Sequence, residues 1–281
     1  MLLTEISNVE IKKILRNNQN KKDYLERLFT LKKLGTPLKR NFDQQIIDTW
    51  EYDISKQVIR DMFKETDKYQ RCLECKVLLD DALSEWQNLD LGTLEWPFAA
   101  AAFDGHVHSL NRNTELSELE KDEVLKSEIV KFRRIKKISE LRNDYIEYLI
   151  FQNENVIPTF GNNRGVDFFI NGKPFDQKVA KSVGRVFIET QGDNYRSIAL
   201  SHPELVAKSL YENQDEDRFG KEPRLLIVYL DTDMTTDQIK EQLENVDFTT
   251  PLNIDFSYYH SSGDGNPTNY NTECFIVLLH H

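Results

Sequence analysis

Cysteine is scarce in this chain, and long apolar runs are missing. Three cysteines occur among 281 residues, at Cys72, Cys75 and Cys274. A sparse, odd number argues against a disulfide framework and fits a reducing compartment. No apolar run approaches the roughly 18 residues of a membrane-spanning helix. The first residues lack the basic segment and apolar stretch of a secretory signal. We therefore expect a cytoplasmic protein.

Two common catalytic signatures are also missing. The sequence has no glycine-rich segment followed by Lys-Ser or Lys-Thr, which would cradle a nucleotide phosphate. It has no serine or cysteine in a glycine-flanked nucleophile elbow. Cations are outnumbered, with 36 Lys and Arg against 47 Asp and Glu and a formal net charge of -11. Because phosphate contacts need clustered cations, this balance is mild evidence against nucleic-acid binding. An acidic metal site would itself lower the total.

The first part of the chain has helical periodicity. Hydrophobic residues make up 39% of the sequence, which is enough for one large domain or two modest ones. Apolar residues recur every three or four positions between residues 43 and 64. We predict that residues 1–113 are mainly helical, with loops over 89–113. A further helix is expected from Thr114 to Gln152, with a break near Ser139.

After Pro158 the pattern changes to short β-branched and aromatic runs separated by helical stretches. This alternation predicts a mixed α/β domain over residues 114–281, with a central mixed sheet flanked by helices. Helices are expected near residues 203–213 and 236–245. The predicted strands are Val166–Ile170, Pro174–Val179, Val186–Thr190, Leu225–Leu230, Ile254–Tyr259 and Cys274–Leu279.

A hairpin centred on Asn171-Gly172 is the most informative segment. Asn-Gly between two apolar runs favours a two-residue type I′ turn. Counting outward from that turn pairs Ile170 with Lys173, and Asp167 with Asp176. Because side chains alternate between the two faces of a strand, Asp167, Asp176 and Lys178 then share one face.

Two directly opposed carboxylates, with Cβ atoms roughly 4.5–5.5 Å apart, repel and destabilise a hairpin. A hard divalent cation removes this repulsion, because Mg²⁺ binds one or two carboxylates together with waters and phosphates. Lys178 could reach a phosphate or its attacking water. The three residues therefore suit metal-assisted hydrolysis of a phosphodiester. The same pattern also fits an exposed hairpin face that is simply charged.

The motif resembles that of the PD-(D/E)xK nuclease superfamily. Asp167, eight intervening residues and Asp176-Gln177-Lys178 match its spacing, and the helical segment around Glu147 is also similar. So is the predicted strand at Gly184–Thr190. The resemblance covers about Asn143 to Asp231. One departure is that Val166, not proline, precedes Asp167.

This resemblance implies a mixed sheet flanked by helices and a Mg²⁺-dependent nuclease. Asp167 and Asp176 would be metal ligands, Lys178 the catalytic lysine and Glu147 an auxiliary acid. The size and the helical N-terminal part resemble type II restriction endonucleases, which cut double-stranded DNA as homodimers. The N-terminal region would then serve DNA recognition or dimerisation. Repair and recombination nucleases share the same core.

Three cations follow the motif closely and are candidate contacts to DNA phosphates, namely Lys181, Arg185 and Arg196. A zinc site from Cys72, Cys75, His106 and His108 has suitable ligand types. We prefer packing for the cysteine pair and a surface loop for the histidines. The rival to a nuclease is a non-catalytic interaction or regulatory protein, in which the two acids would bind no metal.

Overall fold

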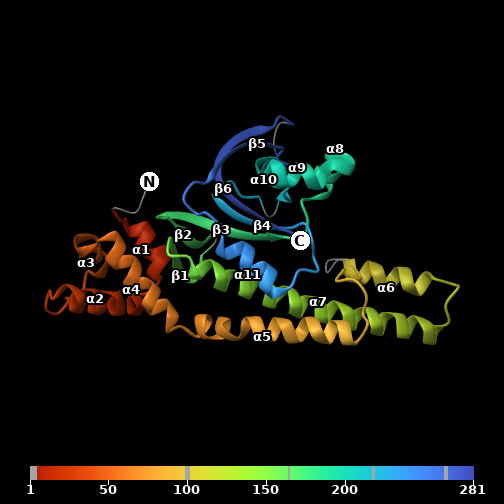
Figure 1. The fold of residues 1–281 in the computed structure, drawn as a ribbon, viewed down its shortest axis with the longest axis horizontal. Coiled ribbons are helices and arrows are strands. Elements are labelled where there is room, and N and C mark those ends of the chain that lie inside the picture. The colour runs from red at the N-terminus through yellow and green to blue at the C-terminus, as the bar shows by residue number, and fades with distance from the viewer. Residues whose placement is uncertain (1–4, 99–101, 164, 217–218, 263–264) are drawn as a thin grey trace. The chain divides into compact units, whose positions relative to one another are not determined.

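The computed structural model describes residues 5–98, 102–163, 165–216, 219–262 and 265–281 (Figure 1). The chain forms two compact units. The first combines Met1–Gln70 with Tyr148–His281, and the second is Arg71–Glu147. The boundary predicted between residues 113 and 114 lies inside the second unit.

The first unit is built on a six-stranded mixed sheet with the strand order β1-β2-β3-β4-β6-β5. The first three strands form an antiparallel meander, β3, β4 and β6 are parallel, and β5 is antiparallel to β6. The predicted mixed α/β class with an N-terminal helical part is confirmed. The strands are β1 (Val156–Asn163), β2 (Val166–Ile170), β3 (Lys173–Ala180), β4 (Arg224–Tyr229), β5 (Leu252–Tyr258) and β6 (Thr268–Leu279).

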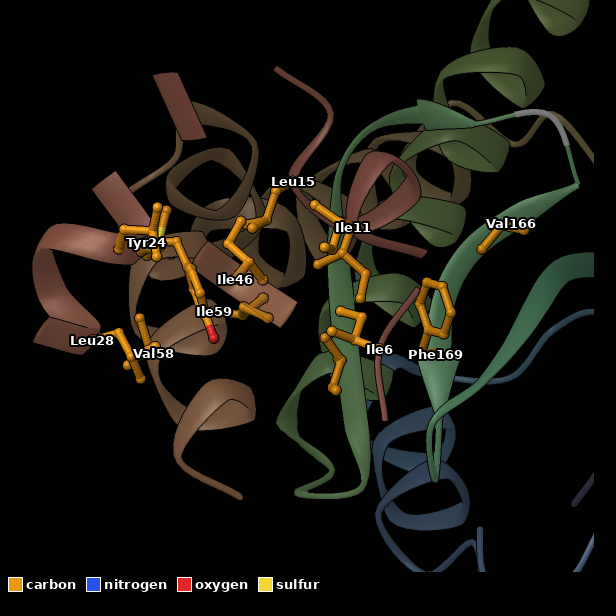
Figure 2. Packing of buried hydrophobic residues seen from close by; sticks show 14 residues of the cluster. Ile6, Ile11, Leu15, Tyr24, Leu28, Ile46, Val58, Ile59, Val166 and Phe169 are labelled. Atoms are coloured by element: carbon orange, nitrogen blue, oxygen red, sulfur yellow. The ribbon is translucent and has the colours of Figure 1, made fainter. Parts of the chain in front are cut away.

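Four N-terminal helices pack on the β1 side of this sheet. Ser7 and Glu10 form a reciprocal capping box that starts the first helix. The first and fourth helices contact β1. Figure 2 shows Ile11 and Ile59 in the same apolar cluster as Val166 and Phe169 of β2. The helices thus support the hairpin that carries the candidate residues. They are α1 (Asn8–Leu15), α2 (Asn18–Lys32), α3 (Phe42–Thr49) and α4 (Tyr52–Lys64).

A helical crossover joins β3 to β4, and it corrects one prediction. Residues Gly184–Thr190 were expected to form a strand, but α8 covers Arg185–Gln191. Parallel strands need a long crossover connection, which is usually helical, and this requirement outweighs the β-propensity of Val186 and Ile188. Phe187 is buried in the cluster beneath the crossover. The rest of the connection is a short 3₁₀ turn (Gly192–Asn194), α9 (Tyr195–Ser201) and α10 (Pro203–Glu212), and α10 packs against β5 and β6 (Figure 1).

Near the C-terminus, α11 (Thr236–Glu244) begins at a capping box formed by Thr235 and Gln238 and packs against β6. The buried side chains Ile239 and Leu243 lie four residues apart, so they share one helical face. This helix was expected at 236–245. β1 was not among the predicted strands.

The second unit contains α6 (Phe103–Arg112) and most of α5 (Asp67–Asn88) and α7 (Glu118–Gln152). The loop predicted over residues 89–113 is therefore wrong in its second half. Helix α6 is held by tertiary contacts that its sequence does not reveal. His106 Nε2 lies 2.7 Å from Glu128 Oε2 of α7, and its ring stacks on Phe98 at 4.9 Å.

Helix α7 runs through Ser139 without the predicted break. Ser117 and Glu120 form reciprocal hydrogen bonds at its start. The buried side chains of Ile135 and Ile138 lie three residues apart, on one face of the helix. Burial of this face outweighs the weak helix propensity of a single serine. Across the described ranges, no helix combines the length and the apolar character needed to span a bilayer.

Candidate active site

The hairpin turn forms as predicted. Asn171 has a φ of 49° and Gly172 a φ of 77°, and positive φ at both central residues is what a type I′ turn requires. The observed pairs are Ile170 with Lys173, Phe169 with Pro174, and Phe168 with Phe175. The register deduced by counting from the turn is confirmed over these three pairs.

Beyond Phe168–Phe175 the ladder gives way to side-chain bonding. The backbone N–H of Gln177 donates to Asp167 Oδ2 at 2.7 Å. The carbonyl of Asp167 accepts from Thr159 Oγ1 of β1 at 2.9 Å. On the other side of β3, the N–H of Asp176 donates to the carbonyl of Pro223 at 3.0 Å. Asp167 is thus joined to β3 through its carboxylate rather than through a continued backbone ladder.

Asp176 is buried at 9% exposure and is flanked by two cations. Lys178 Nζ lies 2.8 Å from Asp176 Oδ2, and Arg224 Nε lies 3.7 Å from the same oxygen. Arg224 is the register partner of Asp176 on the parallel strand β4. The two side chains therefore lie side by side on one face of the sheet, and Lys178 follows two residues later on that face.

The environment of Asp167 raises the pKa of its carboxyl group. Burial is the main cause, and the negative charge of Asp176 adds to it. The hydrogen bond from the Gln177 amide and the positive charges of Lys178 and Lys68 lower this pKa in part. Asp167 thus lies within electrostatic range of both other motif residues. A nearby cation would relieve the cost of ionising it.

A cleft of about 800 Å³ opens over this part of the sheet. Among the described residues, its charged lining consists of two cations, Lys178 and Arg224, and three acids, Asp176, Asp215 and Glu222. Gly165 also lines the cleft, and the missing side chain leaves room for a ligand to approach. Acids outnumber cations by one among these described side chains, and a divalent ion would add positive charge for an anionic ligand.

The candidate ligands for Mg²⁺ are two carboxylates. Asp167 and Asp176 supply carboxylates from adjacent strands, and Mg²⁺ commonly uses one or two carboxylates and completes its shell with waters and substrate. Among the described residues, no group of three or more His, Cys, Asp or Glu side chains could hold a metal ion. Mg²⁺ binding by Asp167 and Asp176 therefore stays a prediction.

Glu147 lies on α7, half buried, at the edge of the second unit. Its negative charge helps raise the pKa of the Cys72 thiol to about 12, after burial and the neighbouring Cys75. Because Glu147 and the Asp167–Lys178 hairpin belong to different units, its role as an auxiliary acid stays a prediction.

The three predicted phosphate contacts differ in their surroundings. Lys181 is exposed just after β3. Arg185 Nε donates to Glu189 Oε1 of its own helix at 2.6 Å. Arg196 forms a bidentate pair with Asp231, at 2.9 and 2.6 Å. None of the three is among the described residues that line the cleft, so their contact with DNA stays a prediction.

Of the alternative zinc ligands, the two cysteines are buried within the second unit, whereas His108 is exposed. Cys72 and Cys75 are buried on α5, and burial raises the pKa of both thiols. His106 and His108 lie on α6, not in the predicted surface loop. His106 is bonded to Glu128.

Arg224 is the site residue that the sequence reading missed. It is 7% exposed and lines the cleft beside Asp176. The sequence offered one signal for it, an arginine directly before the apolar run Leu225–Leu230. Because buried charged residues are rare, a cation next to a buried strand is a candidate functional residue. Comparison of the chain with models of known protein families, with curated proteins and with solved structures finds no match in any of the three.

Proposed function

We propose that this protein is a Mg²⁺-dependent nuclease that hydrolyses phosphodiester bonds of double-stranded DNA. The observation that carries the proposal is the grouping of Asp176 and Lys178, 2.8 Å apart, at a cleft where Asp167 lies within range of both charges. Burial and the charge of Asp176 raise the pKa of Asp167, and acids with perturbed pKa values cluster at functional sites.

Each residue has a role that follows from its surroundings. Asp167 and Asp176 would hold the ion through their carboxylate oxygens. The ion would supply Lewis-acid stabilisation of charge on the phosphodiester. Lys178 is half exposed at the cleft, so its ammonium can leave Asp176 and donate a hydrogen bond to a phosphate oxygen or orient the attacking water.

The acidic balance of the cleft also favours a metal-dependent reaction. Among the described residues of its lining, two cations face three acids, so a divalent ion would add positive charge where a DNA phosphate binds. A divalent ion reverses the local sign of charge. We therefore expect that DNA binding at this cleft requires a divalent cation.

The motif's resemblance to the PD-(D/E)xK superfamily and the mixed sheet flanked by helices support the more specific proposal of a type II restriction endonuclease. Such an enzyme would be sequence-specific and would act as a homodimer. A repair or recombination nuclease is the alternative within the same superfamily.

Digestion of a long, unmodified DNA with Mg²⁺ tests the proposal. Discrete fragments would support sequence-specific cleavage, and a smear would indicate a non-specific nuclease. Intact DNA under all divalent-ion conditions would contradict the proposal and favour a non-catalytic interaction protein.

Variants at the motif make the test specific. Asp176→Ala and Lys178→Ala should each reduce cleavage by at least about 100-fold, in the range expected for loss of a transition-state contact. Lys240→Ala is a matched control, since Lys240 lies in α11 and forms a comparable ion pair with Glu244 at 3.5 Å. Cleavage by both motif variants at the rate of the control would refute the assignment.

A further inference from the structure

We infer that Arg224 is a phosphate-binding residue of the cleft. This inference rests on the proposed function. It names Arg224 as the residue that binds one DNA phosphate beside the predicted metal site. It goes beyond the motif residues, since nothing in the spacing of Asp167, Asp176 and Lys178 points to Arg224.

The first observation is an unsatisfied donor. Arg224 is 7% exposed, yet its Nε has no hydrogen-bond partner among the described residues. The 3.7 Å separation from Asp176 Oδ2 is too long for a hydrogen bond, and that oxygen is already contacted by Lys178 at 2.8 Å. A buried donor without a partner is costly. The Nε is enclosed, so an anion would meet the guanidinium where Arg224 lines the cleft and would offset this cost there.

The second observation is that the surroundings hold the guanidinium in place. Its Cζ lies 5.0 Å from the centre of the Tyr211 ring. The Tyr211 hydroxyl donates to the carbonyl of Glu222 at 3.1 Å. This bond links the stacked ring to the backbone two residues before Arg224. A guanidinium stacked on an aromatic ring keeps its N–H edge available for a planar acceptor.

The third observation is the space left by Gly220, which is buried at the cleft. A Cβ atom at this position would lie 2.6 Å from Arg224 Nη2. The backbone of Gly220 is fixed by Gln214, whose side chain bonds its N–H at 3.0 Å and its carbonyl at 3.1 Å. The absence of a side chain at residue 220 therefore creates the room that the guanidinium occupies.

Phosphate is the chemistry that this arrangement would recognise. A guanidinium fork donates two parallel hydrogen bonds to a phosphate or carboxylate. Asp176 is the register neighbour of Arg224, so a phosphate on Arg224 would also lie next to the predicted metal ligand. Arg224 would thereby position the DNA backbone at the site of cleavage.

The test measures binding of a duplex DNA with Ca²⁺ in place of Mg²⁺, over a range of salt concentrations, alongside cleavage with Mg²⁺. Arg224→Met removes the charge but keeps an apolar stem, and Arg224→Lys keeps the charge but loses the fork. Lys240→Met is the matched control. Circular dichroism and thermal unfolding check that each variant folds.

Arg224→Met should weaken binding at least about ten-fold, since hydrogen bonds to charged groups are strong. It should also reduce the magnitude of the slope of log affinity against log salt concentration by about 1, because one phosphate contact is lost and one fewer counterion is released. Arg224→Lys should retain most of the slope but cleave at least about ten-fold more slowly. Lys240→Met should match the wild type in both measurements.

The outcomes separate the two proposals. A wild type that neither binds nor cuts DNA overturns the nuclease assignment together with this inference. A wild type that cuts, with an Arg224→Met variant whose salt slope is unchanged, overturns the inference alone. If Arg224→Met does not fold, Arg224→Lys decides: slower cleavage with a retained slope supports phosphate binding, and cleavage at the wild-type rate overturns it.

Discussion

At the scale of single residues, Asp167 is the motif acid whose surroundings disfavour its charge. Its pKa is raised mainly by burial and further by Asp176, against partial compensation from the Gln177 amide and two lysines. A group whose pKa is higher in the folded state than in the unfolded state penalises folding above that pKa. The penalty disappears below the pKa of the unfolded chain.

Asp167→Asn should therefore stabilise the metal-free protein near pH 8. The amide oxygen of asparagine can still accept from Gln177 N–H, whereas the charge is gone. A gain of about 1 kcal/mol would raise the thermal midpoint by about 2–4 °C for a chain of this size. The measurement is thermal unfolding with a chelator and then with Mg²⁺. The ion should stabilise the wild type but not the variant. A variant that unfolds at a lower temperature than the wild type under chelation would contradict this account of the carboxylate.

At the scale of elements, the turn between β2 and β3 sets the position of every candidate residue on the hairpin. Gly172 has a φ of 77°, a conformation that costs an L-residue about 1–2 kcal/mol. Asn171, at 49°, tolerates it better, and its side-chain amide also donates to the carbonyl of Phe248.

Gly172→Ala should lower the free energy of unfolding by about 1–2 kcal/mol. Gly105→Ala is the matched control. Gly105 lies inside α6 without a positive φ, and a Cβ atom there would meet nothing within 4 Å. The control should stabilise its helix by about 0.5–1 kcal/mol. Chemical denaturation of both variants measures the difference. Equal effects of the two substitutions would show that the turn conformation is not what constrains Gly172.

At the scale of the whole molecule, one ion pair connects segments that are far apart in the sequence. Asp231 follows β4, pairs with Arg196 of α9, and also accepts the backbone N–H of His281 at 2.8 Å. The hydrogen bonds from Arg196 are the main reason that the pKa of Asp231 falls to about 2. These bonds tie the crossover and the C-terminal end to the sheet.

Because this pKa is lower in the folded state, the stabilisation is present above the pKa of the unfolded chain, near 3.8, and is lost as the pH falls toward 2. Asp231→Asn should lower stability by about 1 kcal/mol at pH 6, a modest value because solvent screens a partly exposed pair. Urea unfolding at pH 6 and at pH 2.5 measures the effect, with Asp193→Asn as an exposed control. A penalty that is as large at pH 2.5 as at pH 6 would rule out the ion pair as its cause.

Local sequence was sufficient to predict those parts of the protein that depend on neighbouring residues. Asn171-Gly172 specifies a turn through its own backbone preferences, and the turn then sets the register of the hairpin by counting. The strand runs from Leu225 and from Cys274 were recognisable because buried parallel strands are apolar on both faces. The grouping of Asp176 with Lys178 followed from the alternation of side chains along one strand.

Features that arise between distant segments depend on tertiary contacts and were not predictable from local sequence. The stretch after Gly184 has β-branched residues, yet it is helical because the chain must cross back to lay β4 parallel to β3. Arg224 became part of the site through that same crossover, 48 residues after Asp176 in the sequence and beside it in the sheet. Local preferences are a few tenths of a kcal/mol per residue. Burial of a whole face of an element contributes several times more, so the tertiary contacts prevail where the two disagree.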